Sequence, residues 1–215
     1  LILIGAVCFY FMEINNVLKG AGIKTALLSS FFQSVTARTA GFNTVDMGVL
    51  TNSTLLLLIL LMFIGASPGS TGGGVKTTSF AILMLLVFNR MKGHENVNVS
   101  NRTISPELVD RTISIIFTAA IVIGLAIALL LLTSDTAGAP LSSRHLFVEY
   151  IFETFSAFGT VGLSMNLTPR LNDTQKCIII LMMFIGRVGP LTLAFAWYSA
   201  RKKGITYAEE TVMVG

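Results

Sequence analysis

An internal repeat constrains this chain more than any other feature of its sequence. When the 215-residue sequence is shifted by 121 residues, the Thr-x-Gly at residues 39–41 aligns with a second one at residues 160–162. The same shift places Met-Phe-Ile-Gly at residues 62–65 on an identical tetrapeptide at residues 183–186, without a gap. Two matches at one offset rarely arise by chance, so we expect two copies of one structural unit.

The composition indicates that these units lie in a membrane. Hydrophobic residues make up 53% of the chain and charged residues 12%, which is about half the charged share of a soluble domain. A helix needs roughly 20 apolar residues to span a bilayer, and only residues 113–132 supply them without interruption. The charges lie between the apolar runs, which argues against nucleic-acid binding. Because Leu1 already lies in an apolar run, without a signal peptide, we expect a fragment that begins inside a transmembrane helix.

Each copy is interpreted as a helix, a short half-helix, a Thr/Gly loop and a second, broken helix. The expected segments are residues 1–12, 25–36, 39–43 and 55–88 in the first copy, and residues 111–132, 146–158, 160–164 and 174–197 in the second. Half-helices of about 12 or 13 residues are too short to span, so they enter and leave on one side. The predicted fold is an all-α integral membrane protein with two helix–pore-loop–helix repeats. The repeats occupy residues 1–90 and 111–199, with a connection at 91–110 and a tail at 200–215.

The basic residues predict the orientation. They gather between the two copies and after the last helix, at Arg90, Lys92, Arg102, Arg111, Arg201, Lys202 and Lys203. The connection at residues 134–145, on the opposite side, carries only Arg144. Basic loops stay in the cytoplasm, so we expect a multi-pass protein of a bacterial plasma membrane whose two half-helix loops open outward.

The loops TAGFN and TVGLS carry chemistry that favours a cation. They align with the TVGYG signature of potassium-channel filters, in which inward-turned backbone carbonyls replace the hydration shell of an ion. Gly permits the positive φ that turns the carbonyls, and the half-helices point their negative ends at the cavity below. A polar kink in a helix bundle is the alternative for one such motif, but two copies in register disfavour it. The candidate filter residues are Thr39, Ala40, Gly41, Phe42, Asn43, Thr160, Val161, Gly162, Leu163 and Ser164. Potassium is expected to bind the carbonyls of Thr39, Gly41, Thr160 and Gly162.

These motifs resemble a known family. SVTARTAGFNT, FIGASPGSTGGGVKTTS, SAFGTVGLS and MFIGRVGPLT are similar to the third and fourth repeats of the Trk/Ktr/HKT cation transporter superfamily, and the closing residues resemble its Ktr branch. The resemblance implies potassium uptake through a four-repeat pore, of which this chain holds two repeats. It also implies a homodimer on a cytoplasmic, nucleotide-binding RCK-type regulatory subunit. No cofactor is implied in this chain, and whether sodium acts as an activator stays open.

The Gly-rich break GSTGGGVKTT has two readings. A phosphate-binding P-loop needs Gly directly before the Lys, whereas Val75 separates Gly74 from Lys76, and no β-strand precedes it. Each Gly costs a helix about 1 kcal/mol, so we favour a flexible, non-helical segment beneath the filter. Such a segment matches the gating loop of the family that the chain resembles. The expected gating residues are Gly69, Gly72, Gly73, Gly74, Lys76 and Arg187.

Arg187 is a charge at membrane depth, where charges usually face a pore or a partner. By the repeat it lies opposite Ala66, beside the Gly-rich segment, so we expect an electrostatic barrier below the filter. The alternative is a buried salt bridge with Glu149 or Glu153. The equivalent of Gly159 in the first loop is Arg38, which we expect to tie the half-helix to its neighbours.

Other function classes fit less well. Glu149 and Glu153 lie four residues apart, but no nucleophile or metal partner accompanies them, so an enzyme is not expected. A structural anchor leaves the two in-register loops unexplained. A sodium-permeable member of the same superfamily stays open as the alternative transporter.

Overall fold

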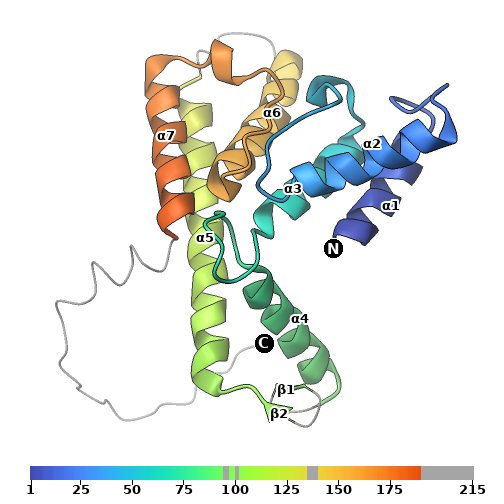
Figure 1. Ribbon diagram of the computed structural model, residues 1–215. Coiled ribbons are helices and arrows are strands. Elements are labelled where there is room, and N and C mark those ends of the chain that lie inside the picture. Colours follow the sequence, from blue (N-terminus) through green and yellow to red (C-terminus); the bar gives the residue numbers. More distant parts are fainter. Residues whose placement is uncertain (94–96, 100–101, 135–139, 190–215) are drawn as a thin grey trace.

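The computed structural model describes residues 1–93, 97–99, 102–134 and 140–189 (Figure 1). The helices are α1 (Ile2–Glu13), α2 (Ile23–Thr36), α3 (Asn52–Phe63), α4 (Thr77–Met91), α5 (Pro106–Leu132), α6 (Pro140–Gly159) and α7 (Asp173–Val188). Short 3-10 turns cover Met47–Val49 and Thr168–Arg170. In the connection expected at residues 91–110, the two-residue strands β1 (Asn98–Val99) and β2 (Arg102–Thr103) pair antiparallel. The predicted tail at 200–215 lies outside the described residues.

Side-chain caps fix where α3 and α7 begin. The Thr51 hydroxyl accepts the backbone N–H of Thr54 at 3.4 Å. At the equivalent position, Asn172 and Gln175 form a reciprocal capping box, with bonds of 2.8 and 3.2 Å. Each cap satisfies N–H groups that the first helical turn leaves without a partner.

α3 ends at Phe63 and α4 begins at Thr77. Between them the chain folds back, so that Ile64 and Val75 form a parallel bridge and the Val75 N–H donates to the Phe63 carbonyl at 3.0 Å. The returning strand passes so close that a Cβ on Gly65 would lie 2.0 Å from the Gly73 carbonyl oxygen. Residues 64–76, the Gly-rich loop, are therefore held at both ends.

α7 is different. A broken helix was expected over residues 174–197, and α7 continues through Arg187 and ends at Val188, followed by Gly189 with φ +88°. Arg187 is compatible with a helix, whereas Gly189 reaches the left-handed region easily and precedes a proline in the sequence. The remainder of the predicted segment lies outside the described residues.

α6 is longer than predicted. We expected a half-helix over residues 146–158, but α6 spans 20 residues from Pro140. The expectation followed the apolar run, whereas Pro is favoured in the first turn of a helix and polar residues such as Ser cost it only roughly a few tenths of a kcal/mol each.

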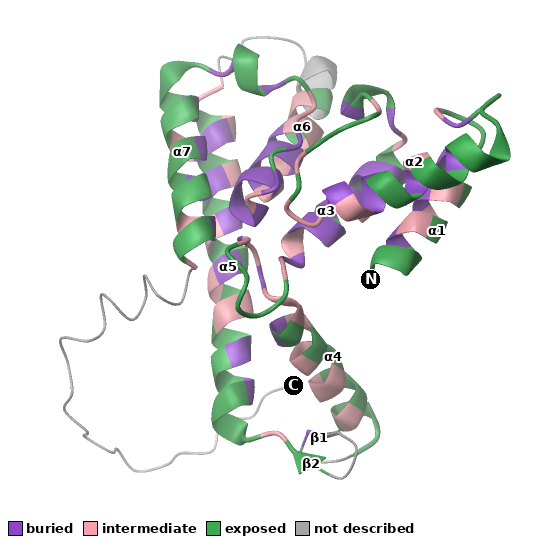
Figure 2. Ribbon diagram, viewed as in Figure 1, coloured by how far each residue is buried: buried purple, intermediate pink, exposed green. Residues whose placement is uncertain are grey.

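The helices pack around α6 (Figure 1). α1 pairs with α2, and α3 lies against both α1 and α6, while α6 and α7 pack on α5 and α4 lies along the other end of α5. Two apolar cores result: Phe152 of α6 joins the first, with Phe9, Leu58 and Met62, and Phe158 of α6 joins the second, with Leu130. Figure 2 shows α6 as the most buried helix, so the loop that follows it starts at the centre of the molecule.

Much of the outer surface is apolar. Large side chains such as Leu3, Phe11 and Phe117 are about 70% exposed, at 73%, 70% and 68%. Among the described helices, α5 alone is long and apolar enough to cross a membrane, while α1, α3 and α4 are shorter apolar helices. Such broad apolar exposure marks contact with lipid or with further protein.

Candidate functional site

The two Thr-x-Gly loops meet in the structure. A Cβ built on Gly41 would lie 2.2 Å from the Val161 carbonyl oxygen and 3.6 Å from the Gly162 Cα. No side chain fits at Gly41, because the colliding atom belongs to the backbone and cannot rotate away. Residues 39–41 and 160–162 therefore lie side by side, although they are 121 residues apart in the sequence.

Both loops have the same alternating backbone. Thr39 and Gly41 have φ of +69° and +77°, and Thr160 and Gly162 have φ of +53° and +93°, whereas the residues between them stay outside this region. Alternation of left- and right-handed conformations turns successive N–H groups to one side and the carbonyls to the other. A Thr with positive φ is uncommon and marks strain at a functional position.

The N–H groups of both loops point back at the helix that precedes them. The amides of Ala40 and Gly41 donate to the Thr36 carbonyl at 3.1 and 3.2 Å. In the second loop, the Val161 amide donates to the Ser156 carbonyl at 2.9 Å and the Gly162 amide to the Ser156 hydroxyl at 3.2 Å. The carbonyls on the opposite face are thereby left for another partner.

The outer residues of the first loop behave differently. The Phe42 carbonyl accepts the Thr36 hydroxyl, so it is turned back toward α2, and the Phe42 side chain is 72% exposed. Asn43 is also exposed. In the second loop, Leu163 is buried in the first core, and Ser164 contacts Thr168.

The Gly-rich loop lies against both Thr residues. The Gly73 N–H donates to the Thr160 hydroxyl at 2.7 Å, and a Cβ on Gly72 would lie 3.0 Å from the Thr39 hydroxyl. The Lys76 ammonium donates to the Ser70 and Gly72 carbonyls, both at 2.9 Å, and so ties the loop to itself.

Two further glycines complete the loop. Gly74, with φ +74°, packs on Gly65, and Gly69, with φ +80°, faces open space. The predicted gating glycines thus have separate positions, and only Gly72 and Gly73 touch the Thr-x-Gly loops.

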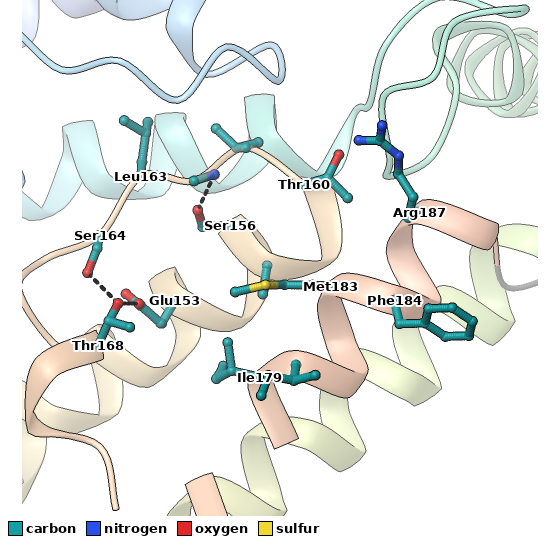
Figure 3. A pocket seen from close by; sticks show the side chains of 14 residues that line it. Glu153, Ser156, Thr160, Leu163, Ser164, Thr168, Ile179, Met183, Phe184 and Arg187 are labelled. Carbon is teal, nitrogen blue, oxygen red and sulfur yellow. Dashed lines mark hydrogen bonds between the residues drawn. The ribbon is translucent and has the colours of Figure 1, made fainter. Parts of the chain in front are cut away.

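A cavity of about 580 Å³ lies between the second loop, α6 and α7 (Figure 3). Arg187 and Thr160 lie near one end of it, and Glu153, Ser164 and Thr168 lie near the other. The C-terminal ends of α2 and α6 and the loop carbonyls give this region a negative potential, which Arg187 opposes.

The alternative prediction for Arg187, a salt bridge with Glu149 or Glu153, is wrong. Glu149 forms its ion pair with Arg170 at 2.6 Å, and Glu153 accepts a hydrogen bond from Thr168. Within the described part of the chain, Arg187 has no ion-pair partner.

Arg38 joins the helix that precedes the first loop to its neighbour. It donates from Nη2 to the Gly65 carbonyl at 2.8 Å and so connects the end of α2 to the end of α3. The roles of Ser156 and Thr168 were not predicted. Ser156 lies four residues before Thr160, one helical turn, and this spacing could have signalled its contact with the loop.

Comparison with known proteins identifies the family. Residues 6–201 match the TrkH family, described as cation transport protein. The chain is 40% identical over 189 residues to Ktr system potassium uptake protein B of Bacillus subtilis, covering 88% of this chain and 40% of that protein. It is 38% identical over 221 residues to the potassium/sodium uptake protein NtpJ of Enterococcus hirae, covering 100% of this chain and 48% of the relative.

A solved structure has the same fold. The potassium transporter TrkH from Vibrio parahaemolyticus superposes with a TM-score of 0.74 at 20% identity, over 91% of this chain and 42% of that one. The chain therefore spans less than half the length of these relatives. The match over residues 6–201 shows that this chain belongs to the TrkH family of cation transport proteins, a family of transporters rather than enzymes, and its largely helical fold agrees with that.

Proposed function

We propose that this chain supplies two of the four helix–pore-loop–helix units of a potassium-uptake pore in the plasma membrane. The observation that carries the proposal is the pair of adjoining Thr-x-Gly loops, whose N–H groups are bonded to their own helices. Their free carbonyls, those of Thr39, Gly41, Thr160 and Gly162, are the potassium ligands. Rings of such carbonyls replace the water around a potassium ion.

The Gly-rich loop is the gate in this proposal. It lies against the inner Thr of each filter loop and is held there by the hydrogen bond from Gly73 to Thr160, while the Lys76 ammonium ties the loop to itself. A few hydrogen bonds of about 1 kcal/mol each are easily exchanged, so the loop can move aside without disturbing α3 or α4. Arg187, beside Thr160, repels the cation while the gate is closed.

A potassium/sodium transporter is the second candidate, because the name of the Enterococcus relative includes both ions. Gly at both visible filter positions favours potassium, since its freedom at positive φ keeps the carbonyls turned inward. Sodium as an activating ion is compatible with either candidate.

The proposed assembly is a homodimer of the full-length membrane protein on a cytoplasmic, nucleotide-binding RCK-type regulatory subunit. The relatives named as proteins of a Ktr system support a multi-component transporter. The proposal includes no cofactor in this chain.

The experiment measures potassium and sodium uptake by the full-length protein in bacterial cells that lack other potassium uptake systems. Wild-type protein is expected to restore growth at low potassium and to take up potassium at least tenfold faster than sodium, a difference of about 1.4 kcal/mol. Uptake of sodium alone, or of neither ion by protein present in the membrane, would reject the potassium proposal. Equal uptake of both ions would favour the second candidate.

A further inference from the structure

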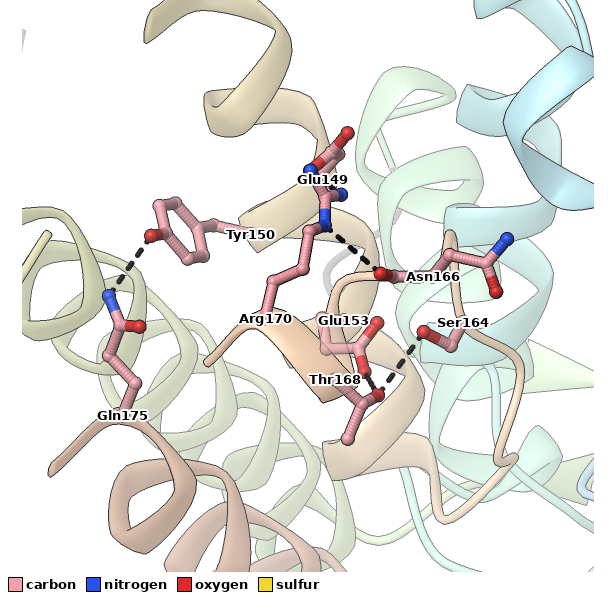
Figure 4. A network of polar contacts seen from close by, with 8 residues as sticks. All are labelled: Glu149, Tyr150, Glu153, Ser164, Asn166, Thr168, Arg170 and Gln175. Atoms are coloured by element: carbon pink, nitrogen blue, oxygen red, sulfur yellow. Dashed lines mark hydrogen bonds and ion pairs between the residues drawn. The ribbon is translucent and has the colours of Figure 1, made fainter. Parts of the chain in front are cut away.

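A chain of polar side chains joins the outer end of the second Thr-x-Gly loop to α6 (Figure 4). The Thr168 hydroxyl donates to Glu153 Oε1, and the Ser164 hydroxyl lies 3.2 Å from the Thr168 hydroxyl. A hydroxyl has one proton to donate, and that of Thr168 is used by the carboxylate. Ser164 is therefore the donor to Thr168, and the chain runs from the loop through Thr168 to Glu153.

Burying the Glu153 carboxylate at this position costs free energy. Glu153 is only 5% exposed, and its second carboxylate oxygen, Oε2, is buried with no hydrogen-bond partner among the described residues. Taking a carboxylate out of water has a large free-energy cost unless its oxygens are all paired. Such a residue contributes little to stability, which points to a different role.

Packing alone does not require the carboxylate. The equivalent residues of the first copy, 121 positions earlier, are Phe32 for Glu153 and Met47 for Thr168. Met47 is fully buried in the first core. The first loop thus reaches the same pattern of positive φ without a carboxylate, with bonds from Thr36 to the Phe42 carbonyl and from Gln33 to the Thr44 hydroxyl, so the carboxylate chain belongs to the second loop.

We infer that Glu153 is a positioning residue that, through Thr168 and Ser164, fixes the outer end of the second filter loop and thereby sets the preference for potassium over sodium. The inference rests on the proposed function. Carbonyls can discriminate between ions of different size only while the surrounding structure holds their spacing. Ser164 directly follows Leu163 and Gly162, so a bond that anchors Ser164 limits the movement of their carbonyls.

Two substitutions of Thr168 in the full-length protein test the inference. Thr168→Val keeps the shape and removes the hydroxyl, whereas Thr168→Ser keeps the hydroxyl. We expect Thr168→Val to lower the potassium-to-sodium uptake ratio about tenfold and Thr168→Ser to lower it less than twofold. Thr103→Val is the matched control, because the Thr103 hydroxyl donates to Asn98 in the exposed β1–β2 connection. It should leave the ratio unchanged.

A double-mutant cycle separates the chain from a general loss of stability. Ser164→Ala breaks the same chain at its exposed end and should lower the ratio in the same direction. If the chain acts as one unit, Thr168→Val with Ser164→Ala should lower the ratio no further than Thr168→Val alone. The melting temperature of each purified protein provides the second readout.

Each outcome bears on the inference. A Thr168→Val protein that loses stability but keeps its ratio would show a structural role only and overturn it. Equal losses in the Val and Ser variants, or additive effects of Thr168 and Ser164, would overturn it as well. Should Thr168→Val fail to accumulate, an unchanged ratio in Ser164→Ala would be decisive against it. A wild-type protein without potassium preference instead rejects the proposed function itself.

Discussion

The two Thr-x-Gly loops share a backbone conformation but differ in the side chains that support them. Below the first loop Met47 is buried and Gln33 donates to the Thr44 hydroxyl at 3.2 Å. Beside the second loop Thr168 and Glu153 form a polar chain. The shared φ values follow from Thr-x-Gly at the end of a helix, whereas the supporting residues are free to differ. The difference teaches that one loop conformation can be supported by different side chains.

The helices that follow the loops differ as well. α3 is interrupted and sends the Gly-rich loop under both Thr residues, while α7 continues and places Arg187 beside Thr160. The first copy thus places a Gly-rich backbone segment against the loops, and the second places a charge there. Four predictions test this difference between the two copies.

Replacing the two filter glycines by alanine should have the largest effect. Both have positive φ, but a Cβ on Gly41 would meet the Val161 carbonyl oxygen at 2.2 Å, whereas a Cβ on Gly162 meets nothing closer than 3.8 Å. We expect Gly41→Ala to reduce potassium uptake about a hundredfold and Gly162→Ala about tenfold, since each 1.4 kcal/mol corresponds to a factor of ten. Uptake assays of the full-length protein measure this.

Gly124→Ala on α5 is the control for both variants, because a Cβ at Gly124 meets no atom within 4 Å. Its uptake should equal that of the wild type. A greater loss at Gly162 than at Gly41 would contradict the close approach of the loops as the reason for Gly41.

The N-terminal caps of α3 and α7 offer a comparison in stability. Glu13 is fully buried and accepts the Thr51 N–H at 3.0 Å, the Thr51 hydroxyl at 2.9 Å and the Thr54 hydroxyl. We expect Glu13→Ala to lower the free energy of unfolding by about 3 kcal/mol, because it leaves several buried donors without a partner. Gln175→Ala should cost about 2 kcal/mol, because it removes a capping box and neutral bonds to Leu130 and Tyr150.

Thermal unfolding of the purified full-length protein in detergent measures both variants. Glu13→Ala should melt at the lower temperature. If the two variants melt together, a charged cap stabilises α3 no more than a neutral one stabilises α7.

Arg187→Gln tests the fixed charge of the second copy. Removing the charge beside Thr160 should raise the maximal rate of potassium uptake about threefold, because the barrier beneath the ion site is lowered. Arg170→Gln, which loses an exposed ion pair, is the control and should leave the rate unchanged. A normal amount of Arg187→Gln protein with a wild-type or lower rate would count against the barrier.

Lys76→Met tests the movable backbone of the first copy and should have the smallest effect. It removes two hydrogen bonds to loop carbonyls at 2.9 Å, one exposed and one partly buried, and we expect about a twofold rise in uptake, since such bonds contribute only about 1 kcal/mol each. Lys92→Met, at the exposed residue after α4, should have no effect. Reduced uptake in Lys76→Met would mean that the lysine holds the gate in an open arrangement.

The sequence predicted the helices best where caps or glycines mark their ends. The starts of α3 and α7, the end of α3 and the positions of both Thr-x-Gly loops follow from local signals, because capping and positive φ are properties of single residues. The start of α6 was misplaced, because apolar periodicity does not report where a polar turn stays helical.

The sequence by itself determined the repeat, the apolar character and the residue types of the two loops. Only the tertiary structure decided which groups meet: Gly41 with Val161, Gly73 with Thr160, and Glu153 with Thr168 and Ser164. Conformation at a glycine depends on its own backbone, so a sequence can signal it. A contact across 87 or 120 residues depends on how α2, α3 and α6 pack, and no local pattern contains that information.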